Sequence, residues 1–462
     1  MTNDRIPKWP LIASAVAIAL VAALVLAMQS ANRTPIVKIP TPVLPSPNAY
    51  DHYASAVGMM KGAEKVGFAV DDSPRPRVSP MQPGVPAPAP PSAQPPPGSP
   101  APSVALAAAP RSNPLDHVYS LAEKEVLVRA NAAALKELRR GLAYDYRRPP
   151  ARSFNATYPE FAKFRSLARA LVLEGQTKAG RGDRGGAMNS HLDAVRFGAD
   201  IPKGGDIIDM LVGCAIQSIG RNGAWKSVDT LNAEQARRAA AYIETIMSRG
   251  VPFAETLQEA KWCTQASLIQ MFKGPGWRHN LFAWVEADSR PDIKVKTLFM
   301  SKRGIFSRYA AYTDECIANA RKPYAVSKAW PRQPNDPVSL LLCPVFGKAR
   351  FAAVKNEAQN GILAVTLALR AYRLEHGKYP ASLAEIAPGY LKKIPNDPFA
   401  AGGPLKYKPT GGKYVLYSLG PDCKDNGGAS IGGPVTPTVP LDHRTRYAQA
   451  DSKGDMVAGI NP

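Results

Sequence analysis

The sequence contains few of the side chains on which most enzymes and metalloproteins depend. Six histidines and five cysteines occur in 462 residues. No HExxH, GxSxG, Walker or GxGxxG arrangement is present, and no two cysteines form a CxxC pair. A zinc site and the common nucleotide-binding and hydrolase classes are therefore not expected. In an extracytoplasmic location the widely spaced cysteines would allow one or two disulfides, with one thiol left over.

Negative charge is also scarce. The chain has 58 Lys and Arg against 37 Asp and Glu, a net charge of +21. The basic residues form short clusters, such as Arg139–Arg140 and Arg147–Arg148, without a zinc finger, an RNP-type aromatic pattern or a basic helix. We therefore do not expect nucleic acid as a partner. Anionic lipid or an acidic polymer could meet such a surface, although a solvated basic surface is the simplest interpretation.

One long hydrophobic run stands near the N-terminus. Leu11–Met28 is apolar except for Ser14, and as a helix it would span about 27 Å, close to the thickness of a bilayer's hydrocarbon core. It predicts a single-pass membrane anchor within residues 1–31, with the lipid bilayer as partner. A cleaved signal peptide is the alternative, but such peptides usually have shorter apolar runs. We favour an extracytoplasmic location for the rest of the chain.

Two segments rich in proline follow the anchor. Residues 32–78 predict a stalk with a short helix, and residues 79–114 a Pro-rich linker. Between positions 80 and 114 lie 13 of the chain's 45 prolines. Such a tract favours extended polyproline conformations and can reach on the order of 100 Å. It is most simply a spacer that lifts domains away from a membrane.

The middle of the chain, residues 115–329, has a helical pattern. Phe161, Phe164 and Leu167 fall at helical spacing, and Asn232 with Gln235 predicts a capping box. Residues 167–198 resemble a tetratricopeptide-type helical pair, with the turn at 180–186 explained by turn chemistry rather than by an adhesion motif. The prediction is an α-helical domain, for which a solenoid-like form is one option. A connector follows at 330–344.

The C-terminal region, residues 345–462, predicts an α+β domain. One long helix runs over 346–374 and ends at Gly377, and two strands at 405–407 and 414–417 are joined by Gly411–Gly412. The fold class of the whole chain is mixed: a single N-terminal transmembrane helix, an α-helical middle domain and an α+β C-terminal domain.

Three separated blocks in this region carry a resemblance. Residues 368–380, 394–398 and 416–422 occur in an order that resembles the G-type pseudopilin, the major pseudopilin of type II secretion. The resemblance implies a long helix on a small antiparallel sheet and a calcium-binding loop. On this basis Asp422, the carbonyl of Leu419 and Asp455 would be ligands.

The loop chemistry adds Asp425 as a further oxygen donor. Calcium takes six to eight hard oxygen ligands, and the Gly-rich loop at 422–428 lets carboxylates and carbonyls converge. The alternative is an acidic turn in which Asp and Asn accept from backbone amides. Lys424 and the insertion at 429–453 depart from the family's pattern. Calcium is the one candidate cofactor, with Leu419, Asp422, Asp425 and Asp455 as candidate ligands.

The position of the apolar run separates this chain from a filament subunit. In a pseudopilin the membrane helix is fused directly to the domain, whereas here the whole middle of the chain lies between them. Assembly by stacking of N-terminal helices is therefore not expected. The layout of anchor, stalk, helical domain and pseudopilin-like domain resembles membrane-anchored envelope proteins of planctomycete-like bacteria.

No constellation of side chains justifies naming catalytic residues. His191 lies on a helical stretch and reads as a packed or surface histidine. Asp314 and Glu315 are neighbours, so on a helix they point in different directions. Glu255 and Glu259 share a helix face, which by default is solvated.

The leading hypothesis is a membrane-tethered, non-enzymatic envelope protein that binds protein or envelope polymer. An accessory component of a type II secretion or pilus-like machine is the alternative. An envelope hydrolase whose site assembles from scattered acids is a more distant one, and a deep polar cleft with two carboxylates in the helical domain would favour it.

Overall fold

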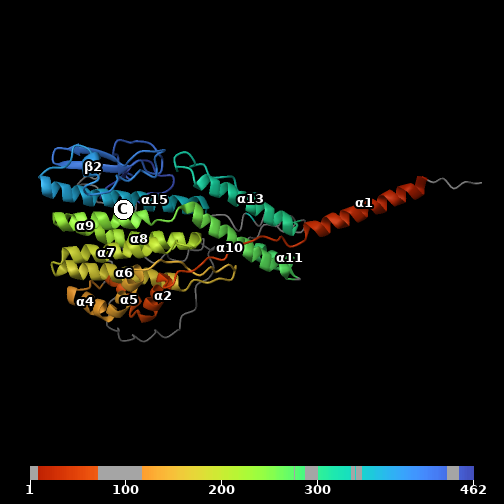
Figure 1. The fold of residues 1–462 in the computed structure, drawn as a ribbon, viewed down its shortest axis with the longest axis horizontal. Coiled ribbons are helices and arrows are strands. Elements are labelled where there is room, and N and C mark those ends of the chain that lie inside the picture. The colour runs from red at the N-terminus through yellow and green to blue at the C-terminus, as the bar shows by residue number, and fades with distance from the viewer. Residues whose placement is uncertain are drawn as a thin grey trace, which may run out of the picture.

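The computed structural model is mostly helical, with one small three-stranded antiparallel sheet (Figure 1). It describes residues 9–70, 117–274, 276–286, 300–334, 339, 346–433 and 447–461. Side chains are described from residue 16 onward, and not for 282–286. The predicted Pro-rich linker at 79–114 and most of the connector at 330–344 lie outside the described residues.

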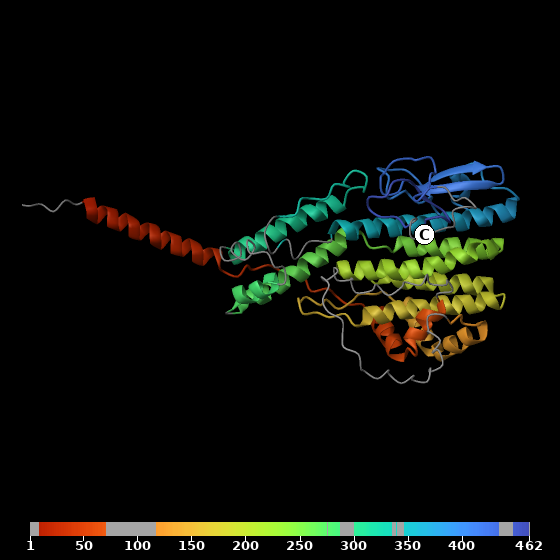
Figure 2. The same ribbon diagram turned by 180° about the vertical axis from the view of Figure 1, so that it is seen from behind.

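Long helices stack side by side to form the body of the molecule, and the sheet covers the outer face of the last one (Figures 1 and 2). Each helix buries one face against the next layer, as expected of apolar stripes at helical spacing. These helices are α6 (Glu160–Gly180), α7 (Arg184–Asp200), α8 (Ile207–Ser227), α9 (Ala233–Ser248) and α15 (Phe346–His376). α7 packs against α6, α8 and α9, and α8 and α9 both pack against α15.

The predicted helical hairpin is confirmed as α6 and α7. Phe164, Leu167 and the rest of the α6 stripe are fully buried. The turn between the helices depends on Gly182, at φ +85°, and on Asp183, whose side chain accepts from the amide of Gly186 at 2.8 Å. An N-cap of this kind satisfies a helix-end amide that has no partner in the helix. The Arg181-Gly182-Asp183 tripeptide is therefore explained by its role in the turn.

The predicted stalk is shorter than expected, because its second half belongs to the body. α2 (Ala49–Met59) and α3 (Ala63–Val70) lie against α5 (Ala132–Leu142) and α6, near α4 (Leu121–Ala130). Tyr53 of α2 is fully buried and donates to Asp200 at 2.8 Å. Tyr53, Val57 and Ala56 form a stripe too short to distinguish a stalk helix from a core helix, so the sequence did not show this burial. In the described part of the predicted stalk, residues 34–45 are the longest segment without turns or helix.

The C-terminal elements match the predicted ones closely. α15 ends at Gly377, whose φ is +72° and whose amide donates to the carbonyl of Arg373. β1 (Lys406–Thr410) and β2 (Lys413–Ser418) form an antiparallel hairpin through Gly411 and Gly412, both at positive φ. A short 3₁₀ helix, η3 (Leu383–Ile386), follows α15. β3 (Met456–Val457) pairs with β2 and was not predicted, since two residues carry no pattern.

The helical middle and the C-terminal region share one hydrophobic core. Ile243 of α9, Leu367 of α15 and Leu416 of β2 belong to the same buried cluster. The capping box that starts α9 is confirmed, with Asn232 accepting from the amide of Gln235. The predicted boundary at residue 345 therefore falls between elements that pack together rather than between two separate cores.

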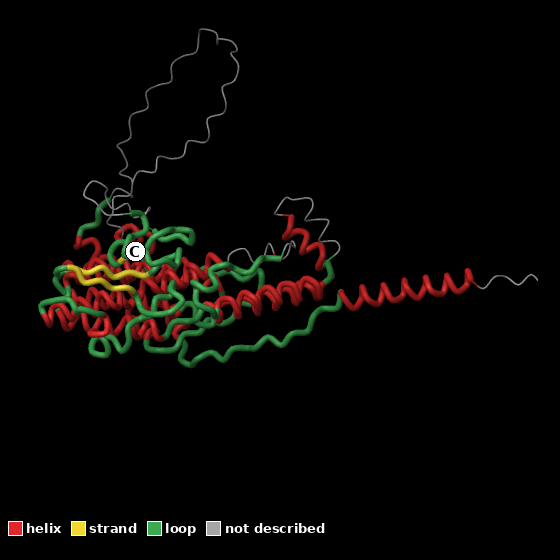
Figure 3. The backbone as a smooth tube through the Cα atoms, turned by 90° about the horizontal axis from the view of Figure 1, so that it is seen from above, coloured by secondary structure: helices red, strands yellow, loops and turns green. Residues whose placement is uncertain are grey.

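An arm of three helices points away from the body, toward α1 (Trp9–Ala31) (Figures 1 and 2). The arm consists of α10 (Phe253–Lys273), α11 (Trp277–Glu286) and α13 (Lys302–Ala320). α1 continues outward beyond the end of the arm (Figure 3). Within the described residues, no helix has both the length and the apolar composition required to cross a membrane.

Candidate functional site

A cavity of about 400 Å³ lies where three segments of the body meet. The first is the loop between α5 and α6, which contributes Tyr146 and Arg147. The second is the turn between α7 and α8, around Gly204. The third is the first half of α10, which presents Glu259 and Trp262. A concave site with a few convergent polar groups and aromatic walls is where small ligands usually bind.

The turn between α7 and α8 requires glycine at the cavity wall. Gly204 has a φ of +70°, and a Cβ there would lie 2.7 Å from Cγ of Arg147. The side chain of Arg147 therefore packs directly over the turn. The next residue, Gly205, donates its amide to the carbonyl of Pro202 at 3.0 Å, which closes the turn.

Two buried polar atoms of residues that line the cavity have no hydrogen-bond partner among the described residues. Tyr146 is only 3% exposed, yet its hydroxyl has no partner, and Nε of Arg147 is likewise buried and unpaired. A buried polar group without a partner costs roughly 1–3 kcal/mol. Burial raises the pKa of Tyr146 well above its usual value, so the phenol is neutral.

A buried ion pair behind the cavity fixes the direction of this loop. Arg148 Nε lies 2.6 Å from Oδ1 of Asp209, and Nη2 donates to Oδ2 at 2.7 Å. The guanidinium also lies 4.7 Å from the ring centroid of Tyr158. Arg148 is held in the core, and the two residues before it, Tyr146 and Arg147, line the cavity.

One carboxylate that the sequence places on a solvated helix face is in fact buried. Glu259 is 6% exposed and accepts from Nε and Nη2 of Arg152 at 3.0 and 3.2 Å. Arg152 also donates to the carbonyl of Pro40, so the extended N-terminal segment passes this side of α10. That cover explains the burial, which spacing alone does not reveal. Glu255, one turn earlier, is exposed as expected.

The charges around the cavity nearly balance. Lys203 is held by Asp200 at 2.6 Å, and Glu259 is held by Arg152. Arg147, Glu255 and the aromatic groups are left to meet a ligand. This set suits a polar ligand of low net charge. No motif marked these residues, and the one signal in the sequence is the Gly204–Gly205 pair, which indicates a tight turn.

The structure brings two of the predicted calcium ligands to one loop. Asp455 is fully buried and accepts from the amides of Asn426 and Gly428, at 3.3 and 2.7 Å. Asp422 accepts from the amides of Lys424 and Gly454, at 3.1 and 3.3 Å. The long insertion therefore does not separate the two aspartates in space.

Asp425 and Leu419, the other two predicted ligands, make hydrogen bonds to other partners. Asp425 accepts from the hydroxyl of Tyr417 at 3.0 Å and lies 3.8 Å from Nζ of Lys406. The amide of Leu419 donates at 2.8 Å to Asp397, a buried aspartate in the 394–398 block. Across the described ranges no group of three His, Cys, Asp or Glu side chains could hold a metal ion. In this arrangement Asp422 and Asp455 accept from backbone amides, as the acidic-turn alternative describes.

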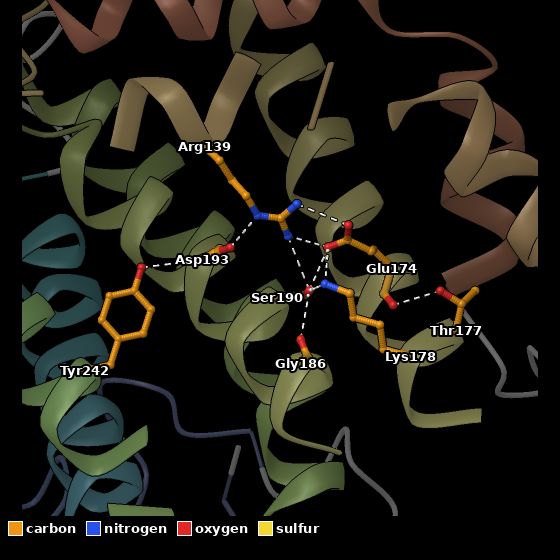
Figure 4. A network of polar contacts seen from close by, with 8 residues as sticks. All are labelled: Arg139, Glu174, Thr177, Lys178, Gly186, Ser190, Asp193 and Tyr242. Carbon is orange, nitrogen blue, oxygen red and sulfur yellow. Dashed lines mark hydrogen bonds and ion pairs between the residues drawn. The ribbon is translucent and has the colours of Figure 1, made fainter. Parts of the chain in front are cut away.

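A second polar cluster crosses four helices of the body (Figure 4). Glu174 of α6 accepts from Arg139 of α5 and from Ser190 of α7. Arg139 also donates to Asp193 at 2.8 Å, and Tyr242 of α9 donates to the same aspartate at 3.0 Å. Burial alone would raise the pKa of Glu174, but these hydrogen bonds outweigh it and lower the pKa to about 2. A permanently charged carboxylate ties helices together and is poorly suited to acid–base chemistry.

His191 is a packed histidine, one of the two alternatives given for it. Its side chain is 2% exposed, and it fits because Gly175 and Gly223 lack side chains. A Cβ would lie 2.3 Å from the ring at Gly175 and 2.5 Å at Gly223. Burial lowers the pKa of His191 to about 4, helped by Lys226 and Lys178, so the ring is neutral at pH 7.

The remaining candidates form no site. Asp314 is exposed and pairs with Lys261 at 2.5 Å, which agrees with a solvated acidic step. Four cysteines are free thiols, so the disulfides that an extracytoplasmic location would allow do not form among them: Cys214, Cys263, Cys316 and Cys423. Cys343 lies outside the described residues.

Comparisons with known proteins return no match: no family model, no curated protein and no solved structure is significantly similar to the chain. The class of protein is therefore defined by its own architecture, a layered helical body with a small sheet, a cavity and a projecting arm.

Proposed function

We propose that this protein is a membrane-tethered, non-enzymatic envelope protein that binds an envelope polymer in the cavity beside α10. The observation that carries the proposal is a concave site whose lining combines the aromatic side chain of Trp262 with Arg147 and Glu255. Because the charged groups there nearly cancel, the favoured ligand is an uncharged or zwitterionic stretch of oligosaccharide. Sugar rings offer C–H faces to an aromatic wall and hydroxyls to the polar groups.

The tether is supported by α1. The helix has 23 residues, about 34 Å at 1.5 Å per residue. Its described apolar side chains are largely exposed, for example Ile18 at 70% and Leu26 at 65%. Exposed apolar surface costs on the order of 25 cal/mol per Å² in water, and lipid would remove that cost. Since side chains are described only from Val16, the proposal rests on this exposure together with the whole run Leu11–Met28.

Binding rather than catalysis is supported by the state of the carboxylates. Both oxygens of Glu259 are engaged by Arg152, which leaves Glu255 as the one acid at the cavity without an ion-pair partner among the described residues. A general acid and a base acting on one bond would both need to reach the substrate.

The ligand is tested with the full chain in detergent micelles on an array of bacterial-surface oligosaccharides. Trp262→Ala removes the aromatic wall and should reduce binding at least tenfold. Glu255→Gln should reduce it more weakly. The matched control is Glu234→Gln, an exposed glutamate at the start of α9, which should leave binding unchanged. Binding that ignores Trp262→Ala, or no binding to any glycan, would remove the proposal.

The tether is tested by membrane fractionation with a carbonate wash. Leu20→Arg together with Leu24→Arg places two charges in α1, each costing roughly 2.5–3.5 kcal/mol at the centre of a spanning helix. The variant should be released into the wash while the wild type is retained. Leu374→Arg, at an exposed position of α15, is the control and should stay with the membrane. Wild-type protein in the soluble fraction would contradict the tether.

A hydrolase is the second candidate, because Glu255 and Glu259 line the same cavity. It predicts release of reducing ends from the bound glycan and loss of that activity in Glu255→Gln with binding retained. An accessory role in secretion has the support of the long helix α15 with its small sheet. Neighbouring genes for a secretion ATPase or prepilin peptidase would favour it.

A further inference from the structure

The tip of the arm, formed in its described part by residues within 268–281 and 300–308, is built around a small apolar cluster of its own. Phe272 at the end of α10, Trp277 at the start of α11 and Ile305 near the start of α13 are buried together. Phe272 and Trp277 meet edge to face at 5.4 Å. This cluster is separate from the cores of the body and gives the tip a defined shape.

The tip lies at the point where α1 leaves the molecule (Figures 1 and 2). α1 contacts α13, and Nη2 of Arg278 donates to Oδ1 of Asn32, just after the end of α1, at 3.4 Å. Any surface that receives the C-terminal end of α1 would therefore also lie close to the tip.

Two segments of the tip carry basic charge without acidic charge. Residues 268–281 and 300–308 contain no Asp or Glu. The intervening residues 282–299 have three acidic and three basic side chains, which cancel in the sequence. Three of the tip's basic residues are exposed and the other two half-buried: Lys273, Arg303 and Arg308, then Arg278 and Lys302.

The half-buried lysine shows how the basic groups are held around the cluster. Nζ of Lys302 donates to the carbonyl of Phe272 at 2.5 Å and lies 5.6 Å from the ring centroid of Trp277. Farther along the arm the pattern changes, since Lys261 is paired with Asp314. Within the arm, the excess of positive charge therefore lies at the tip.

We infer that the tip of the arm rests on the membrane surface and binds anionic lipid headgroups, giving the protein a second attachment beside α1. The inference rests on the proposed tether, because α1 is what brings the tip to the bilayer. A Lys or Arg close to an anionic leaflet contributes about 1 kcal/mol, and the attraction decays within a Debye length of roughly 8 Å. Five such residues beside the tether would set the tilt of the body over the membrane.

The experiment uses the full chain in lipid nanodiscs, with a photo-crosslinking amino acid in place of Ser307, an exposed residue between Arg303 and Arg308. We expect crosslinks to lipid to be at least fivefold more abundant in discs with one-third phosphatidylglycerol than in pure phosphatidylcholine discs. They should fall at 0.5 M NaCl. The triple variant Lys273→Glu, Arg303→Glu, Arg308→Glu should lose the difference between the two lipids.

A matched triple reversal on the body, Lys136→Glu, Arg140→Glu, Lys163→Glu, is the control, because these residues are exposed on α5 and α6. It should leave the crosslinks unchanged. Equal crosslinking in neutral and anionic discs, or equal loss in both triple variants, would overturn the inference.

Retention of the chain in the disc reports on α1 separately. Protein that stays in the disc without lipid crosslinks at residue 307 keeps the tether and rejects the contact at the tip. Protein that never enters the disc rejects both.

Discussion

The body and the tip of the arm use arginine in opposite ways. In the body, guanidinium groups form ion pairs with carboxylates from other segments: Arg148 with Asp209, and Arg139 with Glu174 and Asp193. At the tip, residues 268–281 and 300–308 carry no acidic residue. The net charge of +21 is therefore not an even coating, and composition alone does not locate the region that would meet an anionic partner.

Arg221 is a buried charge in the body whose hydrogen bonds go to side-chain amides. It is 2% exposed and donates to side-chain amide oxygens of α15, at 2.7 Å to Asn356, 2.8 Å to Asn360 and 2.6 Å to Gln359. Burial lowers its pKa to about 10. Buried polar networks of this kind contribute little net stability but select one arrangement of the helices. Here the arrangement selected is that of α8 against α15.

The sharpest test of this comparison removes one buried partner. Arg148→Ala leaves Asp209 as an uncompensated buried carboxylate, which should lower the free energy of unfolding by about 3–5 kcal/mol. Urea denaturation measures it. Arg238→Ala is the matched control, since Arg238 and Glu234 form an exposed pair worth less than about 1 kcal/mol. Equal losses in the two variants would contradict the distinction between buried and exposed pairs.

The packing of the body can be tested at one glycine. Gly175→Ala drives a methyl group to 2.3 Å from the ring of His191, and overpacking of this kind typically costs about 1–3 kcal/mol. Gly58→Ala is a helical control with open space around the new Cβ, and it should stabilise the protein by up to about 1 kcal/mol. Opposite signs for the two variants in thermal denaturation are the expected result.

His191 should make the body sensitive to mild acid. Its pKa is lowered to about 4, from an ordinary value of 6.5. Between these values the unfolded chain binds a proton that the folded chain excludes, so stability is complete above pH 6.5 and falls as pH drops toward 4. The loss between pH 7.5 and pH 5 should be about 2 kcal/mol.

Urea titrations at both pH values measure this loss. His191→Gln should remove it, and His279→Gln, at an exposed position of α11, should not. A wild-type chain with the same stability at pH 7.5 and pH 5 would show that the ring is not held neutral.

Local features of the fold were predictable from the sequence, and burial between distant segments was not. The α6 stripe around Phe164, the capping box at Asn232 and the hairpin at Gly411–Gly412 depend on neighbours within a few residues. The burial of α2 depends on helices that follow almost a hundred residues later. A short amphipathic stripe looks the same on a stalk and in a core.

The candidate site was missed for the same reason. Tyr146, Gly204 and Trp262 come from three segments that meet only in the folded chain, and none carries a motif. The glutamates of α10 were noticed from their spacing. The segment that covers Glu259 includes Pro40, which spacing within α10 cannot reveal.

The smallest expected change in stability concerns the acidic loop of the C-terminal region. Its carboxylates accept from backbone amides, whereas those of the body pair with arginine. Asp422→Ala removes an acceptor for the amides of Lys424 and Gly454, so it should cost about 1 kcal/mol even in the presence of a chelator. Asp451→Ala, an exposed neighbour, should cost nothing measurable.

Calcium then tests the resemblance to the G-type pseudopilin. At ten times Kd it would add about 1.4 kcal/mol to the wild type. A gain that Asp422→Ala lacks assigns the loop to calcium, and no gain leaves it a turn held by backbone amides.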